Sequence, residues 1–310
     1  MSLLVVGSVA YDTIKTPHGE APDALGGAAV YFSLAARIFT PVRLVGVVGD
    51  DFRDDDVRLL EARKIDLGGL ERVRGGKTFR WSGEYSPDMN RRETLSVELN
   101  VFQDFRPKVP EAFRDSRFVF LANASPVTQA SVLDQMDRPD FVMADTMDLW
   151  IQTQHRELVD LLGRIDGLLL NDSEAMLLTD RHNLIDAGRA ILAMGPSRVV
   201  IKKGEHGSVL FEGDRIVPLP AYPTSHVKDP TGAGDSFAGA LMGFLAQKGS
   251  SGPRKSKGQG VEPKTFKVAL AYGTVVASFT VEDFGVRRIA EATEGDTRER
   301  FEVYREFLTL

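Results

Sequence analysis

Short apolar runs rich in β-branched residues recur along the chain, and they constrain its fold more than any other feature of the sequence. Each run is nearly continuous, which is typical of a strand buried on both faces, as in a parallel sheet. Segments with helical spacing lie between the runs, at residues 28–38, 157–162 and 184–194. The clearest runs are at residues 3–6, 42–48, 117–121, 141–144, 167–170 and 199–201.

Strands that alternate with helices predict an α/β fold with right-handed crossover connections. We expect a three-layer sandwich, with a central, mostly parallel sheet and helices on both of its faces. No internal repeat and no linker divides the sequence, so we expect a single domain over residues 1–310.

Residues 77–102 interrupt this alternation. Phe79, Trp81 and Tyr85 are all odd-numbered, so they share one face if the segment is extended. A Ser-Pro-Asp turn signal follows at 86–88, and apolar residues alternate again after it. The segment is predicted to be an inserted β-hairpin that forms a small β-lid. The alternative is an ordinary hairpin at the edge of the main sheet.

Residues 248–264 form a second interruption, between two segments of helical character. They are rich in Gly, Ser, Pro and Lys and have almost no apolar side chains. Such a composition buries too little apolar surface to order a chain segment. We therefore expect a mobile surface loop at this position.

The composition excludes several classes of function. The chain has no cysteine, which excludes disulfides, thiolate metal sites and a cysteine nucleophile. Lys and Arg number 38 against 44 Asp and Glu, giving a formal net charge of -6, so no nucleic-acid partner is expected. No run approaches the roughly 18 apolar residues of a membrane span, and residues 1–7 lack the basic flank of a signal peptide. We expect a cytoplasmic protein without a membrane partner.

The segment 229–239, with the sequence DPTGAGDSFAG, carries the strongest chemical signal. Gly232, Ala233 and Gly234 are small enough for their backbone N–H groups to approach an anion closely. Residues 236–246 are apolar all round, which is typical of a buried helix. The small residues are therefore predicted at the start of a core helix, where unpaired N–H groups and the helix dipole favour negative charge.

Asp235 follows directly on these small residues. A merely structural carboxylate would repel a phosphate there, whereas a general base that takes the proton from an attacking hydroxyl suits the position. Taken alone, the residue fits an N-cap Asp equally well. The glycine-rich run that precedes it favours the general base.

The run 229–239 resembles the C-terminal signature of the ribokinase-like (PfkB) family of carbohydrate and nucleoside kinases. Other segments resemble further motifs of this family and follow the family's order along most of the chain. They are GSVAYD at 7–12, GGAA at 26–29, VGVVGDDF at 45–52, NDSE at 171–174 and IKKGEHGSV at 201–209. The resemblance implies a ribokinase-like fold and an ATP-dependent kinase.

The resemblance also implies catalytic roles. Asp235 would deprotonate the acceptor hydroxyl, and the N–H groups of Gly232, Ala233 and Gly234 would stabilise charge on the γ-phosphate. The predicted function is phosphorylation of a hydroxyl on a sugar or sugar-containing metabolite. One alternative is a nucleoside kinase of the same family. The other is an inactive homologue that binds sugar or nucleotide, against which the intact Asp235 and glycine run argue.

On the nucleotide side, the resemblance implies that Asn171 and Glu174 lie near the phosphates, with Glu174 holding Mg²⁺ mostly through water. Asp229 and Thr231 match positions that hold a monovalent cation, usually K⁺, in many members of the family. The resemblance further implies that the nucleotide site is lined by Lys202, Gly204 and Gly207.

On the acceptor side, the resemblance implies that Asp12 binds a substrate hydroxyl. Tyr31 stands where sugar-specific ribokinases have a short polar residue, which favours the nucleoside alternative. Aromatic side chains on the lid would exclude water and stack on a sugar or base, or else seal a homodimer, lid against lid. The predicted acceptor-binding residues are Asp12, Gly26, Gly27, Tyr31, Phe79 and Trp81.

Overall fold

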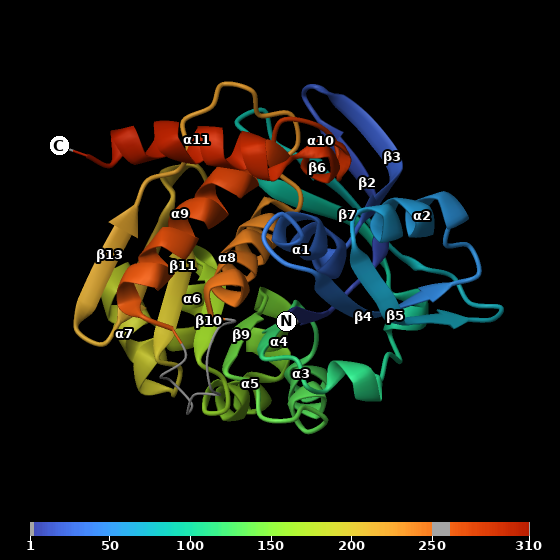
Figure 1. Ribbon diagram of the computed structural model, residues 1–310, viewed down its shortest axis with the longest axis horizontal. Helices are drawn as coiled ribbons and strands as arrows, with labels where there is room; N and C mark the ends of the chain where they lie inside the picture. The colour runs from blue at the N-terminus through green and yellow to red at the C-terminus, as the bar shows by residue number, and fades with distance from the viewer. Residues whose placement is uncertain (1–2, 250–260, 310) are drawn as a thin grey trace.

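A nine-stranded sheet runs through the middle of the computed structural model, which describes residues 3–249 and 261–309 (Figure 1). The strand order is β13-β12-β11-β10-β9-β8-β1-β4-β5. All neighbours from β5 to β11 pair in parallel, and β12 is antiparallel to both of its neighbours. The strands are β1 (Leu3–Val6), β4 (Val42–Gly49), β5 (Ile65–Val73), β8 (Phe118–Leu121), β9 (Phe141–Asp145), β10 (Gly167–Asn171), β11 (Arg198–Lys202), β12 (Ser208–Glu212) and β13 (Arg215–Leu219).

Helices cover both faces of this sheet and bury a separate apolar cluster on each face. One face carries α1 (Ala28–Ala36), α2 (Asp54–Ala62), α8 (Ala233–Gly249), α9 (Pro263–Thr280), α10 (Arg287–Glu291) and α11 (Glu294–Phe307). The other carries α3 (Pro126–Leu133), α4 (Asp148–Thr153), α5 (His155–Leu162), α6 (Asp172–Thr179) and α7 (Leu184–Ala193). The predicted α/β sandwich with a mostly parallel sheet is therefore confirmed.

The strands of the central sheet follow the apolar runs closely. Each of the six runs named above is a strand, and its side chains are almost all buried. The edge strands β5 and β13 were not predicted, because exposed polar residues interrupt their apolar pattern. β12, which lies between β11 and β13, was not predicted either. In the described part of the chain, no helix has the length and apolarity needed to cross a membrane.

A second sheet, which we call the lid, has the strand order β3-β2-β6-β7 in the described residues. β6 (Phe79–Tyr85) and β7 (Arg92–Glu98) form an antiparallel hairpin, and β2 (Ala10–Thr16) and β3 (Gly19–Gly26) form another. β2 joins the two hairpins by pairing in parallel with β6. The lid is thus larger than the single hairpin predicted from residues 77–102.

The loop predicted at residues 248–264 is shorter than expected at both ends. α8 continues to Gly249 and α9 begins at Pro263. Pro is well placed at the first position of a helix, where its missing N–H would have no partner. Residues 250–260 lie outside the described residues.

Candidate active site

The glycine run at 232–234 marks the start of α8, as predicted. Gly232 has a φ of 73°, and a Cβ built on it would lie 2.3 Å from the ring of Tyr31. Both its backbone conformation and its packing therefore require glycine. α8 is buried along most of its length, so its N-terminal N–H groups are held rigidly by the core.

Asp235 lies inside the first turn of α8 and not before it, so the N-cap interpretation of this residue is wrong. Its carboxylate forms no hydrogen bond with any other described residue. Burial and, next, the charge of Asp145 raise the pKa of Asp235, Lys202 and Arg92 lower it, and the net pKa is about 7. A half-buried carboxylate with a pKa near neutrality and no structural partner suits a general base.

Asp12 lies in β2 of the lid and not directly after the first strand of the core. The backbone N–H of Gly27 donates to its carboxylate, and a Cβ on Gly26 would lie 2.0 Å from Oδ2. The two glycines thus let the main chain close around the carboxylate. Burial, with the charges of Asp229 and Asp235, raises the pKa of Asp12; the Gly27 N–H and Arg92 lower it, and the net pKa is about 7.

Tyr31 belongs to α1, and its side chain packs on Gly232 and is acted on by the charges of both carboxylates. It is 1% exposed, and its hydroxyl finds no hydrogen-bond partner among the described residues. Burial raises the pKa of this hydroxyl well above its usual range, and Asp12 adds most of the charge effect. A buried, unpartnered hydroxyl beside a carboxylate is an open site for a ligand hydrogen bond.

Asn171 and Glu174 form a capping box at the start of α6, a structural role that their sequence motif did not reveal. The Asn171 side chain accepts from the Glu174 N–H at 2.8 Å, and Glu174 Oε2 accepts from the Asn171 N–H at 2.7 Å. Burial and, next, the charge of Asp145 raise the pKa of Glu174, Lys202 lowers it, and the net pKa is about 7. No cluster of three or more metal-ligating side chains occurs within residues 3–249 and 261–309.

Asp145 and Lys202 end two strands of the central sheet beside Asn171. Lys202 and Asn171 are partners in register, and β9 flanks β10 on the other side. The Lys202 ammonium lies 3.2 Å from Asp145 Oδ2. Active sites of open α/β sheets gather at the carboxyl ends of parallel strands, and these side chains occupy that edge.

The two residues predicted to hold a monovalent cation fasten the glycine loop. The carboxylate of Asp229 is fully buried and accepts from the N–H groups of Thr231 and Gly285, at 2.9 and 2.8 Å. The Thr231 hydroxyl lies 3.1 Å from the hydroxyl of Tyr85 on the lid. The loop before α8 therefore contacts both the C-terminal segment and the lid.

The aromatic side chains of β6 lie in different surroundings. Phe79 stacks on Phe102 at the base of the lid, with 5.5 Å between ring centroids, so its ring is taken up by packing. Trp81 is only half-buried, and its partner in register on β2 is Asp12. Side chains of partners in register share a face of the sheet, so Trp81 lies on the side that carries Asp12.

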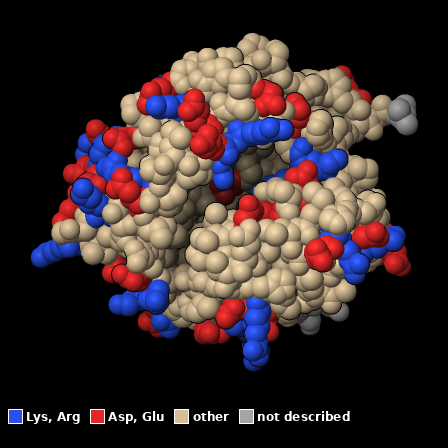
Figure 2. Space-filling model, turned by 180° about the vertical axis from the view of Figure 1, so that it is seen from behind, with Lys and Arg blue, Asp and Glu red and all other residues tan. Residues whose placement is uncertain are grey.

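Arg92 on β7 is a site residue that the sequence did not reveal. It lies opposite Tyr85 in the lid hairpin, and its guanidinium lies 5.3 Å from the Trp81 ring. It forms no ion pair within the described residues, yet its charge lowers the pKa of both Asp12 and Asp235. Figure 2 shows one face of the molecule deeply hollowed, with basic and acidic side chains along the edge of the hollow.

A short 3₁₀ turn, Gly204–His206, follows β11; Gly204 begins it and Gly207 comes directly after it. Both have a positive φ, of 54° and 86°. A Cβ on Gly207 would lie 2.1 Å from the carbonyl oxygen of Leu219, whereas nothing lies within 4 Å of one on Gly204. Gly207 is thus required by packing, and Gly204 borders open space next to Lys202.

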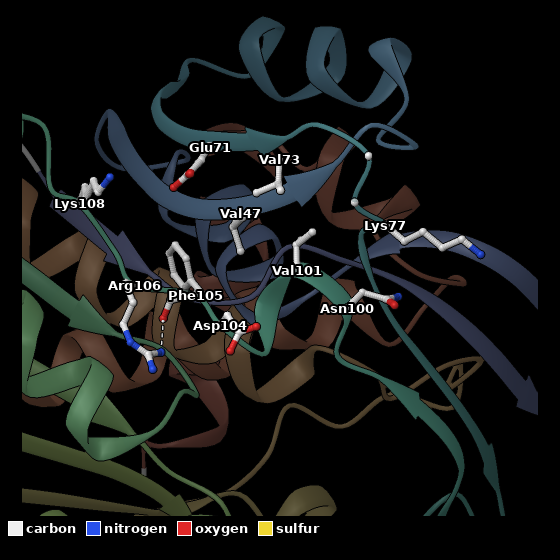
Figure 3. A pocket seen from close by; sticks show the side chains of 12 residues that line it. Val47, Glu71, Val73, Lys77, Asn100, Val101, Asp104, Phe105, Arg106 and Lys108 are labelled. Carbon is white, nitrogen blue, oxygen red and sulfur yellow. Dashed lines mark hydrogen bonds between the residues drawn. The ribbon is translucent and has the colours of Figure 1, made fainter.

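A cavity of about 580 Å³ lies away from these residues, at the base of the lid (Figure 3). Val47, Val73, Val101 and Phe105 form its apolar lining, with Lys77 at the point where the chain enters the lid. None of the residues predicted for catalysis or nucleotide binding lines it. It is therefore a feature separate from the site around Asp235.

Comparison with known proteins decides the family. The model of the pfkB family carbohydrate kinases matches residues 2–293. The chain belongs to this family. Its relatives include a cytidine kinase of Thermococcus kodakarensis, with 29% identity over 79% of this chain and 88% of that protein. A nucleoside kinase of Methanothermobacter thermautotrophicus has 28% identity over 96% of this chain and 95% of that protein.

Solved structures show the same fold at lower identity. The nucleoside kinase of Methanocaldococcus jannaschii has a TM-score of 0.76 and 20% identity, covering 97% of this chain and 98% of that one. The ribokinase of Giardia lamblia has a TM-score of 0.81 and 15% identity, covering 97% and 99%. The resemblance inferred from the sequence motifs is thus confirmed. As a pfkB kinase the chain is an ATP-dependent phosphotransferase that acts on a hydroxyl group.

Proposed function

We propose that the acceptor is a nucleoside, whose sugar hydroxyl is deprotonated by Asp235. The observation that carries this proposal is the pairing of Trp81 with Asp12 on one face of the lid. A carboxylate suits the hydroxyls of a sugar, and a half-buried indole beside it suits the flat face of a base. Relatives named cytidine kinase and nucleoside kinase support the same acceptor class.

In this proposal the pocket is formed by the lid and the core together. Asp12 and the open hydroxyl of Tyr31 bind the sugar, and Gly26 and Gly27 hold Asp12 in place. Asp235 takes the proton of the attacking hydroxyl, while the N–H groups of Gly232, Ala233 and Gly234 stabilise the charge on the transferred phosphate. Phe79 supports the base of the lid and does not touch the acceptor.

The nucleotide would lie along the ends of β10 and β11, near Asn171 and over the turn of Gly204 and Gly207. Lys202 would contact its phosphates. Mg²⁺, bound through water to Glu174, would neutralise phosphate charge. The fit is supported by the buried Glu174 and Asp145. Burial and, next, the charge of Asp145 raise the pKa of Glu174, and a divalent cation beside the two carboxylates would offset both effects.

Activity should depend on both kinds of metal ion. A chelator of Mg²⁺ should abolish transfer, since Lys202 and the N–H groups of the glycine run cannot by themselves compensate the charge of the ATP phosphates. We also propose K⁺ binding beside Asp229 and Thr231, so rates in potassium buffer should exceed those in sodium or choline buffer at equal ionic strength. Equal rates in the three buffers would remove the K⁺ site from the proposal and leave the Mg²⁺ site intact.

The acceptor class is tested by initial rates of ADP formation with a panel of nucleosides and the corresponding free pentoses. We expect kcat/KM for the best nucleoside to exceed that for free ribose by about 10²-fold, because stacking on Trp81 is worth roughly 1–3 kcal/mol. Trp81→Ala should remove most of this preference and leave the KM for ATP unchanged. A free sugar as the preferred acceptor of the wild-type protein would overturn the nucleoside proposal.

We further propose that the protein is a homodimer through the lid. β7 is an edge strand of the lid, and its apolar residues Leu95 and Val97 are 47% and 52% exposed. An exposed apolar edge strand is prone to pair with another chain. Sedimentation velocity of wild type and Val97→Lys tests this, and a monomeric wild type would remove the proposal.

A further inference from the structure

Lys202 connects the central sheet to the glycine loop. Its side chain is 20% exposed, and its ammonium lies 3.2 Å from Asp145 Oδ2 at the end of β9. On the other side, a Cβ built on Gly234 would lie 3.2 Å from the same ammonium. The ammonium is therefore in contact with the small residue that would form part of the anion hole.

Most of the hydrogen-bonding capacity of Lys202 is unused. An ammonium has three donors, and Asp145 is its single hydrogen-bond partner within the described residues. The nearby carboxylates of Asp145, Glu174 and Asp235 outweigh burial and raise the pKa of Lys202, so it is charged at neutral pH. A charged ammonium with open donors beside Gly234 can bind a phosphate oxygen.

Asp145 is itself fixed by other bonds. Its Oδ1 accepts from the N–H of Thr146 at 2.8 Å. Its carbonyl oxygen accepts from Gln129 Nε2 at 2.9 Å, and that amide also donates to Leu121 and Ala122. These bonds tie the end of β9 to β8 and leave Oδ2 free for Lys202. Burying a carboxylate costs free energy unless the charge is paired, and Oδ2 of Asp145 is paired with the Lys202 ammonium.

We propose that Asp145 is a positioning residue for phosphoryl transfer: it holds the Lys202 ammonium against Gly234, where the ammonium contacts the phosphate in transfer. The proposal rests on the anion-hole assignment made above. It does not depend on which acceptor is used. Nothing in the family resemblance assigned a role to Asp145, and Lys202 was expected only to line the nucleotide site.

A double-mutant cycle tests this proposal. Lys202→Met should lower kcat by about 10²-fold, as loss of a donor to the transition state does. Asp145→Asn should lower kcat by about tenfold or more, with the KM of the acceptor changed less than threefold, as loss of an orienting partner does. Because Asp145 acts through Lys202, the double variant should be no slower than Lys202→Met alone.

The pH dependence of kcat/KM provides a second test, because it would not change if Asp145 had only a structural role. Asp235 is faced by Asp145 from β9, Lys202 from β11, Arg92 from β7 and Asp12 from β2. Removing the negative charge of Asp145 should move the acid limb of the rate profile to lower pH. Removing the positive charge of Lys202 should move it to higher pH. If Asp145→Asn does not fold, the shift in Lys202→Met still tests the placement of the ammonium.

Asp140→Asn is the matched control. Asp140 is a buried carboxylate that pairs with Arg117 at 2.5 Å, and it lies at the opposite end of β9 from Asp145. It should lower stability without a shift in the acid limb. The proposal would be overturned if the losses of kcat in the two single variants multiplied in the double variant. It would also be overturned if Asp145→Asn, like Asp140→Asn, lost stability without a shift in the acid limb. If wild type prefers a sugar, the nucleoside proposal fails, and the same cycle run with that sugar still tests Asp145.

Discussion

Asp235→Asn is expected to lower kcat by about 10²-fold or more, because Asn cannot accept the proton of the attacking hydroxyl. The affinity for ATP, measured by calorimetry with a non-hydrolysable analogue, should change little. Stability should not fall. The pKa of Asp235 is raised to about 7 in the folded protein, so ionised Asp235 costs stability above pH 7. The thermal midpoint of Asp235→Asn at pH 8 should therefore match or exceed that of wild type.

Asp186→Asn is the control for this substitution. Asp186 also lies in the first turn of a helix, but it is exposed and on α7, away from the site. Its replacement should leave kcat unchanged. A near-normal kcat in Asp235→Asn with the preferred acceptor would contradict the assignment of Asp235 as the base.

Gly232→Ala is expected to lower kcat by about 10²-fold and the thermal midpoint by several degrees. The new Cβ would lie 2.3 Å from the Tyr31 ring, so the loop or the ring must move. Displacement of a single anion-hole donor costs about 10²–10³ in kcat. The movement of Tyr31 should also raise the KM of the acceptor, which initial-rate kinetics would measure.

Gly75→Ala separates the effect of packing from that of backbone strain. Gly75 has a φ of 72°, nearly equal to the 73° of Gly232, but a Cβ on it would meet nothing within 4 Å. Its replacement therefore carries the strain of a positive φ alone, roughly 1 kcal/mol. Equal losses of activity in both variants would show that contact with Tyr31 is irrelevant.

Sequence reasoning worked where a single physical pattern dominates. The buried strands were predicted because both faces of each are apolar, and the start of α8 was predicted because the small residues directly precede an apolar helix. The position of Asp235 at that start follows from the same pattern, and its role as the base stays a prediction. In each case the signal is local, and no contact between distant segments is needed to interpret it.

The residues that were missed depend on pairing between distant segments. Arg92 reaches the site because the hairpin register sets it opposite Tyr85, and the length of a turn does not fix that register in advance. Asp145 directly follows an apolar run, and polar residues at the carboxyl ends of parallel strands commonly belong to the active site. This position was the feature from which the sequence could have predicted Asp145 as a site residue. The capping role of Asn171 and Glu174 was hidden because the same spacing also matched a family motif.

The central claim is that Asp235, a half-buried carboxylate of raised pKa, serves as the base. The pH dependence of kcat/KM tests it most directly. Asp12 and Asp235 act on each other, so the acid limb reports the pair, and it should lie near pH 7. Arg92→Gln should move this limb to higher pH, because Arg92 lowers both pKa values, while the exposed neighbour variant Arg91→Gln should not. A rate that stays constant from pH 5 to pH 8 would contradict the account.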